Sequence, residues 1–455
     1  MKKYLLLTAM VLSVLVGCEL ASRQQTSTDA SAAAVFGAGC VQVAFKPTLP
    51  MDVDVLNQSC TNAFAWQTFV AMTWPADPET PGKPDTTATL EDWGMPGNLT
   101  PMVFGTFKSS EETFMDHAPD PWGSNHEGIM NEAADDTDCN RKLFAFNKFN
   151  GGEDVVQEVL QAAGGKVPWL TDQNGNLIWY EEKINEVEFD YIYSNRLYDP
   201  AAQYAKAVAD KGIWLPNGSM ELKASWCEIP EDQYERMKYR YKIIQACVPD
   251  TAYIQAGKVV VTDFVEKKLG LVGLHIIHKT PSAPQMIWAT FEHVDLAPVG
   301  TPCEADGRKW LLYNPADCEV KPNQHPDVDD PIFNPIQITK VNMATPDMDA
   351  QRINEYLQSQ LAQEDPNNVF QYYRMVGSQW PSSAVADADN SMTPPLSDGG
   401  KTPFVLTNVS MESYAQGASC LTCHVFSQTA PFEDKPPLGA DYSFLLGKAK
   451  PQQEL

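Results

Sequence analysis

The alternation of side chains between residues 220 and 227 most strongly limits what this chain can fold into. Apolar residues occupy every second position: Met220, Leu222, Ala224 and Trp226 alternate with Glu221, Lys223, Ser225 and Cys227. Successive side chains of a β-strand point to opposite faces of the sheet, so a period of two indicates a strand with one buried face. We therefore predict a half-buried strand here.

The same strand-like character extends over the central region, about residues 168 to 298. Further strands are predicted at 239–248, 258–265, 270–280 and 285–295. Pro281 and Pro284 lie between the last two, where a turn would join them as a hairpin. The strand at 270–280 is apolar on both faces, which is typical of a central strand. A mainly antiparallel sheet or a partly closed barrel is expected.

Helical spacing of apolar residues flanks this region. It predicts a helix over residues 61–72, ended by Trp74-Pro75, and a second helix over 346–363, ended by Asp365-Pro366. Between 76 and 102, five prolines and several glycines indicate an irregular segment. The predicted fold class is α+β, with a central sheet flanked by N-terminal and C-terminal helices.

The first residues, MKKYLLLTAMVLSVLVGC, resemble a bacterial lipoprotein signal. Two lysines precede an apolar stretch that is short for a membrane span, and Gly17 comes directly before Cys18, the residue that would be acylated. An ordinary secretory peptide cleaved elsewhere, or a short anchor helix, is the alternative. Glu19 stands where an aspartate would favour the inner membrane, so the outer membrane, on its periplasmic side, is the favoured location.

The composition divides the remaining chain into segments. Residues 1–17 are expected to be the signal peptide and 18–39, rich in Ala, Ser, Thr and Gln, a flexible tether. A mainly β body with an N-terminal helix is expected over 40–345, followed by a helical and loop segment over 346–455. No later stretch is apolar for long enough to span a membrane.

Near the end of the chain, Cys420-Leu421-Thr422-Cys423-His424 forms the pattern C-x-x-C-H. In this pattern two cysteines form thioethers to a haem and the histidine becomes an axial ligand of its iron. With ten cysteines and seven histidines in 455 residues, the pattern is too rare to expect by chance. A zinc half-site and a redox C-x-x-C are the alternatives, but no second C-x-x-C and no preceding βαβ unit supports them. One covalent haem c is predicted, bound by the C-terminal segment.

The second axial position of that iron has few candidates. Residues 425–455 contain neither methionine nor histidine, so the position would be filled from upstream, by a weaker ligand such as a lysine, or by nothing. The candidates for the distal or second axial position are His275, His278, His293 and Met411. His275 and His278 lie three apart on one predicted strand and would face opposite sides of it. For each of them, a buried and hydrogen-bonded structural role is the alternative.

Seven cysteines remain after Cys18, Cys420 and Cys423 are set aside. Export to an oxidising compartment favours disulfides, and the pairs closest in sequence are Cys40 with Cys60 and Cys303 with Cys318. Each would close a short loop and stabilise the fold by roughly 3 kcal/mol. An odd number implies at least one free thiol or an intermolecular bridge.

The charge excludes some classes of partner. With 33 Lys and Arg against 59 Asp and Glu, the formal net charge is -26. Nucleic acid and anionic lipid surfaces are therefore not expected partners, whereas a basic redox protein in the periplasm is compatible with the acidic surface. Membrane contact is expected only through acylated Cys18.

Several segments resemble those of large, exported bacterial single-haem proteins of the cytochrome c family. They are AFAWQTFVAMTWP, NGSMELKASW, GLVGLHIIHKTPSAPQMIWATFEHVD and SCLTCH followed by ADYSFLL. The resemblance implies haem and electron transfer and names no substrate. The tail, C-x-x-C-H followed by residues 440–444, is also similar to the ending of small β-sheet cytochromes that include hydroxylamine oxidisers and β-type cytochromes c-prime. That similarity implies a five-coordinate haem packed against an antiparallel sheet.

Two functions follow as hypotheses. The first is a membrane-anchored single-haem c-type cytochrome that transfers electrons in the periplasm. The alternative is a haem enzyme with an open distal site for peroxide, a nitrogen oxide or a small organic substrate, in which His275, His278 or Glu292 moves protons. Glu221 and Lys223, two apart on one strand face, are expected to form a solvated ion pair, with a functional polar patch as the alternative.

Overall fold

The computed structural model describes residues 35–124, 169–250, 252–255, 258–261, 264–303, 308–326, 334–341, 347–380, 405–424 and 426–453. The predicted signal peptide and Cys18 lie outside these ranges. The helices are α2 (Gln58–Thr73), α3 (Ser110–Thr113), α5 (Glu186–Ser194), α6 (Pro200–Asp210), α7 (Tyr234–Met237), α8 (Met348–Glu364) and α9 (Cys420–His424). The strands are β1 (Lys108–Ser109), β2 (Ile178–Ile184), β3 (Met220–Glu228), β4 (Ile243–Pro249), β5 (Ala252–Gln255), β6 (Lys258–Val261), β7 (Phe264–Thr280), β8 (Ala283–His293) and β9 (Tyr373–Gln379).

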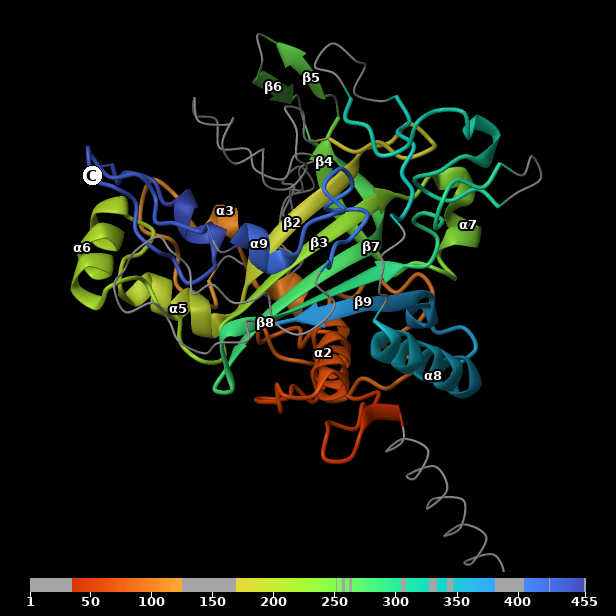
Figure 1. Ribbon diagram of the computed structural model, residues 1–455, viewed down its shortest axis with the longest axis horizontal. Helices are drawn as coiled ribbons and strands as arrows, with labels where there is room; N and C mark the ends of the chain where they lie inside the picture. The colour runs from red at the N-terminus through yellow and green to blue at the C-terminus, as the bar shows by residue number, and fades with distance from the viewer. Residues whose placement is uncertain are drawn as a thin grey trace, which may run out of the picture.

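A seven-stranded antiparallel sheet occupies the middle of the molecule (Figure 1). Its order is β1-β2-β3-β7-β8-β9, and β4 pairs with the first part of β7. Strand β7 is central, as predicted, and the turn after Thr280 joins it to β8 as the predicted hairpin. The sheet is open and not a barrel, so of the two predicted forms the open one is correct. Alternation along a strand does not distinguish these two forms, because both bury the same face.

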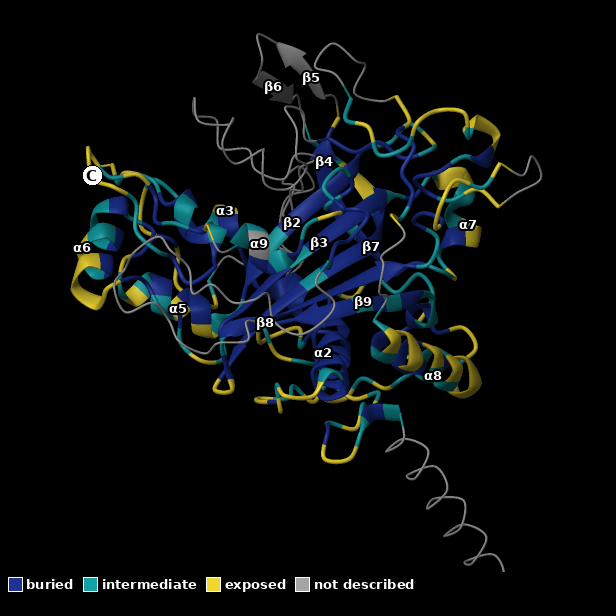
Figure 2. Ribbon diagram, viewed as in Figure 1, coloured by how far each residue is buried: buried dark blue, intermediate teal, exposed yellow. Residues whose placement is uncertain are grey.

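One face of the sheet packs against α2 and α8, which lie on the same side of the strands (Figures 1 and 2). Asn57 caps α2, its side-chain oxygen accepting a hydrogen bond from Ser59 N, and the helix ends just before Trp74-Pro75. Every residue of α2 except Gln58 is buried, so this helix lies within the core. Both α2 and α8 confirm the helices predicted from sequence.

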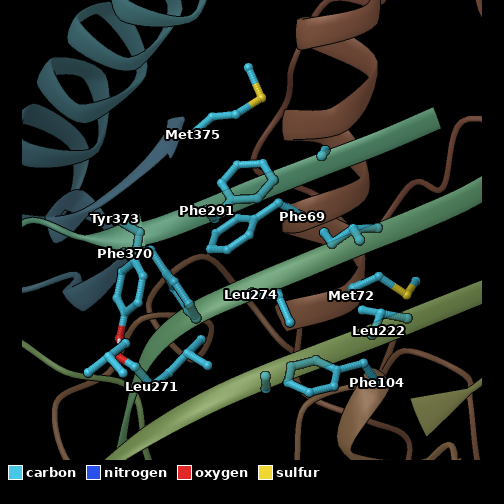
Figure 3. Packing of buried hydrophobic residues seen from close by; sticks show 14 of the residues in the cluster. Phe69, Met72, Phe104, Leu222, Leu271, Leu274, Phe291, Phe370, Tyr373 and Met375 are labelled. Carbon is cyan, nitrogen blue, oxygen red and sulfur yellow. Dashed lines mark hydrogen bonds between the residues drawn. The ribbon is translucent and has the colours of Figure 1, made fainter. Parts of the chain in front are cut away.

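The main hydrophobic core lies between α2 and the sheet (Figure 3). Phe69 of α2 stacks on Phe291 of β8, with ring centroids 4.4 Å apart, and Phe370 and Tyr373 complete the aromatic cluster. The Tyr373 hydroxyl donates to the carbonyl of Leu271, 2.9 Å away, so its polar atom is satisfied inside the core. Burial of each such side chain contributes about 2 kcal/mol to stability.

Two parts of the fold differ from the sequence-based expectation. Helices α5 and α6 lie within the region predicted to be strand-like; they begin at Asn185 and at Asp199-Pro200, which are ordinary helix start signals. Strand β3 is covered on both faces and not half-buried, because the C-terminal segment packs over its polar face.

The disulfides Cys40–Cys60 and Cys303–Cys318 are both present, as predicted from sequence proximity. Cys247 also takes part in a disulfide. Cys227 is a buried free thiol, which accounts for the odd number of cysteines.

Candidate functional site

A cavity lies between the sheet and the C-terminal segment, on the face opposite α2. It encloses about 990 Å³ not filled by protein atoms, part of it open to solvent. Cys420, Cys423 and His424 line it from one side, and side chains of β2, β3, β7 and β8 line it from the other.

The C-x-x-C-H residues form the short helix α9. Residues three and four apart in a helix share a face, so Cys420, Cys423 and His424 point in a common direction, into the cavity. Leu421 faces away and is buried against a small apolar cluster that includes Ile277 and Trp288. Leu421 thus anchors α9 to the sheet, and the two cysteines and His424 on the other side of the helix face the cavity.

The imidazole of His424 is held in a defined orientation. Its Nδ1 lies 2.9 Å from the carbonyl oxygen of Tyr442, and because a carbonyl only accepts, Nδ1 must donate. The ring packs between Trp288, at 4.4 Å between centroids, and Phe444, at 4.8 Å. A ring that donates through Nδ1 has its lone pair on Nε2, the arrangement found in metal-ligating histidines.

The tail that supplies this carbonyl has an unusual backbone. Asp441 and Tyr442 have φ angles of 46° and 65°, in the left-handed region that side-chain-bearing residues rarely adopt. The Asp441 carboxylate accepts from the backbone N–H of Leu215, 2.8 Å away, and forms a buried ion pair with Lys279 at the end of β7. These contacts hold the turn that presents the Tyr442 carbonyl to His424.

A second turn, residues 405–416, docks the segment before α9 onto the same face of the sheet. The Asn408 amide donates to Thr290 Oγ1 and to the Phe291 carbonyl, at 3.0 and 2.8 Å. Ser410 Oγ lies 2.6 Å from Ser225 Oγ. Gly273 allows this approach, because a Cβ there would lie 2.4 Å from Ser410 Oγ. This turn was not predicted from the sequence, where its one signal is a short polar run.

His275 is the distal candidate that the fold places in the cavity. It lies on β7 and lines the cavity, and its Nε2 is 3.0 Å from Glu412 Oε1. Burial acts to raise the pKa of Glu412, but His275, Lys223 and the N–H of Asn408 hold that pKa below its usual value. This contact fixes the His275 ring at the cavity wall.

The other three candidates lie elsewhere. His278 is on the opposite face of β7, as its spacing from His275 predicted, and stacks on Phe64 of α2 at 5.3 Å. His293 is buried, with Nε2 3.0 Å from the carbonyl of Arg240. Met411 belongs to the main hydrophobic core. The structure therefore does not bring His278, His293 or Met411 to the cavity.

The polar face of β3 is part of the cavity wall. Glu221 and Lys223 both line it, so the expectation of a solvated ion pair is wrong. The segment 405–448 covers this face, which the alternation of β3 could not reveal. Burial lowers the pKa of Lys223, while Glu182 and Glu412 act to raise it, and the ammonium lies 6.0 Å from the ring centre of Tyr180.

These residues fit a covalent haem. Two cysteines and one oriented imidazole share the cavity wall, and a second imidazole faces them. Within the described ranges, no group of three or more His, Cys, Asp and Glu side chains is arranged to hold a metal ion. Haem iron needs no such group, because the porphyrin supplies four of its ligands.

None of the described helices is both long enough and apolar enough to cross a membrane.

Comparison of the chain with protein-family models, with curated proteins and with solved structures gives no match.

Proposed function

We propose that this chain is a single-haem c-type cytochrome that transfers electrons. The observation that carries the proposal is the convergence of Cys420, Cys423 and His424 on one cavity wall with His275 on the sheet side. Cys420 and Cys423 would form the thioethers, and His424 would coordinate the iron through Nε2. A haem held in this way supplies an iron that gains or loses one electron.

His275 is the residue we propose for the second axial position. Because its Nε2 faces the Glu412 carboxylate, Nε2 donates and the lone pair lies on Nδ1, so a carboxylate would support the ligand from behind. Two histidine ligands would close the iron to small molecules. That coordination suits a protein whose substrate is an electron.

Redox catalysis is the second candidate function. It is favoured by the charged side chains on the cavity wall: Glu182, Glu221, Lys223, Glu412 and Lys448. If His275 does not bind iron, the same His275–Glu412 pair could move a proton to or from a substrate such as peroxide or a nitrogen oxide. The two functions differ in whether the iron has an open position.

We also propose a cellular location and a redox partner for this chain. The N-terminal signal would direct the chain to the periplasmic side of a bacterial membrane, favouring the outer membrane, with acylated Cys18 as the anchor. The acidic chain would exchange electrons with a basic periplasmic redox protein.

The test is an optical and electron paramagnetic resonance spectrum of the purified protein, oxidised and reduced, with and without carbon monoxide. We expect a low-spin spectrum that carbon monoxide does not change. A high-spin spectrum that binds the gas would reject the electron-carrier proposal and support catalysis. A protein without any haem absorbance would reject both.

A further inference from the structure

Three carboxyl groups lie buried together beside the cavity. Glu188 is on α5, Glu221 is on β3 and Asp441 is in the tail that holds His424. Their exposed fractions are 0%, 6% and 3%. They come from segments far apart in sequence, so the fold assembles this group.

The described residues do not provide enough donors for these carboxyl groups. Both side-chain oxygens of Glu188, Oε1 of Glu221 and Oδ1 of Asp441 are buried without a hydrogen-bond donor in the described part of the chain. Asp441 has Lys279 as its cation. Two buried, ionised glutamates side by side would be costly, because each would lose its hydration without gaining a counter-charge.

A single proton bound between the two glutamates lowers the cost of burying them. Helix α5 begins two residues after Ile184, the strand partner of Glu221, and the Asn185 N–H donates to the Met220 carbonyl, so Glu188 and Glu221 lie at one junction of α5 and β3. Each carboxyl acts on the other there, so one proton can be shared between them. Burial raises the pKa of Glu188 well above its usual range, and the charge of Glu221 raises it further. Burial also raises the pKa of Glu221 to about 7. Carboxyl pairs that share a proton titrate as one unit.

The pair adjoins the site proposed for haem on two sides. Glu221 lines the cavity itself. Asp441 interacts electrostatically with both glutamates and directly precedes Tyr442, whose carbonyl orients His424. A change of charge at the iron would therefore act on the pair through a protein interior, where charges are weakly screened.

We propose that Glu188 and Glu221 form a proton-binding pair that takes up a proton when the iron is reduced and releases it when the iron is oxidised. This inference rests on the proposed function. The electron comes from a one-electron donor, the periplasmic redox partner, and the proton comes from solvent. One negative and one positive charge enter together, so the charge of the buried region stays constant.

The groups that face the pair are consistent with this role. Ser443 donates to Glu221, and the negative charges of Glu182 and Asp441 act on it from β2 and from the tail. Lys279, at the end of β7, opposes the uptake of a proton by Glu188. Lys448 neutralises Glu182, with 2.5 Å between Nζ and Oε2. Glu182 and Asp441 thus each pair with a lysine, whereas in the described part of the chain neither Glu188 nor Glu221 forms an ion pair.

The test is the midpoint potential of the holoprotein as a function of pH, from about pH 5 to about pH 9, by spectroelectrochemistry. Reduction favours the protonated pair, so the potential falls as the pH rises. The slope does not exceed about 59 mV per pH unit, the value for one proton per electron. The double variant Glu188→Gln/Glu221→Gln, which keeps the shape and removes the titration, is expected to lose this slope.

The matched control is Glu186→Gln, on the same helix α5, where the side chain is 42% exposed and pairs with Lys83. It is expected to retain the slope of the unmodified protein. A potential independent of pH in the unmodified protein, or an unchanged slope in the double variant, would overturn the inference while leaving the haem proposal intact. Absence of bound haem would instead reject the proposed function.

A second measurement does not depend on the folding of a variant. The infrared difference spectrum between the oxidised and reduced holoprotein is expected to contain a carbonyl band of a protonated carboxyl group. That band would arise only from a carboxyl group that gains or loses a proton, or changes its environment, with the iron. A difference spectrum without a carboxyl band would contradict the proposal.

Discussion

The Nδ1 atom of His424 lies 2.9 Å from the carbonyl oxygen of Tyr442, and this contact joins the C-x-x-C-H helix to the tail that follows it. Two consecutive left-handed residues, Asp441 and Tyr442, place that carbonyl. Such residues cost about 1–3 kcal/mol each and persist only where neighbours hold them. Lys279 and the N–H of Leu215 hold Asp441.

Asp441→Asn is expected to destabilise the protein by about 3–5 kcal/mol, because it leaves the Lys279 charge buried without a carboxylate. The double variant Lys279→Met/Asp441→Asn is expected to lose less, since no charge stays uncompensated. Urea unfolding measures both. For comparison, Lys83→Met breaks an exposed pair with Glu186 and should cost less than about 1 kcal/mol. Equal losses in the Asp441 and Lys83 variants would contradict the positioning role of Asp441.

His275→Ala is expected to open the iron, giving a high-spin spectrum and binding of carbon monoxide. His278→Phe is the matched control, because it alters the same strand three residues away on the face that packs against Phe64. Its haem spectrum should equal that of the unmodified protein. If the His275 variant stays low-spin, another group closes the iron.

Lys223→Met is expected to lower the midpoint potential by tens of millivolts, because a cation at the cavity wall favours the reduced iron. The control is Lys267, on β7 of the same sheet, whose side chain is 44% exposed and paired with Glu228. Lys267→Met should leave the midpoint potential unchanged. Equal shifts in the two variants would mean that Lys223 does not act on the iron.

Acid is expected to destabilise the fold through His278. Burial lowers the pKa of His278 to about 4, below its usual value of about 6.5, so the unfolded chain binds this proton first. Stability is therefore lost as the pH falls from about 6.5 to about 4, by roughly 3 kcal/mol, and this contribution changes no further below that. His278→Phe should flatten this part of the stability curve, measured by urea unfolding at each pH. If the variant loses the same stability as the unmodified protein over this pH range, His278 is not responsible for the loss.

Local sequence patterns predicted those parts of the fold that depend on neighbouring residues. The spacing of apolar residues and the flanking prolines located α2 and α8, and the β7–β8 turn followed from Pro281 and Pro284. Sequence proximity identified the disulfides Cys40–Cys60 and Cys303–Cys318. The opposite orientations of His275 and His278 followed from the period of a strand.

Features of the fold and the site that depend on residues far apart in the sequence could not be predicted from local patterns. The polar face of β3 looked solvated because the segment that covers it begins about 180 residues later in the chain. For the same reason nothing local indicated that Glu188 and Glu221 would meet. The choice of His275 from four distal candidates required the sheet register and the position of the 405–416 turn. The covalent haem itself stays a prediction.

The most direct measurement of the central claim is the intact mass of the exported protein under denaturing conditions, because thioether-bound haem survives unfolding. We expect a mass greater than that of the polypeptide by one haem, and no such increase in a Cys420→Ala/Cys423→Ala variant. A correctly exported protein with no added haem mass would show that Cys420 and Cys423 do not bind haem.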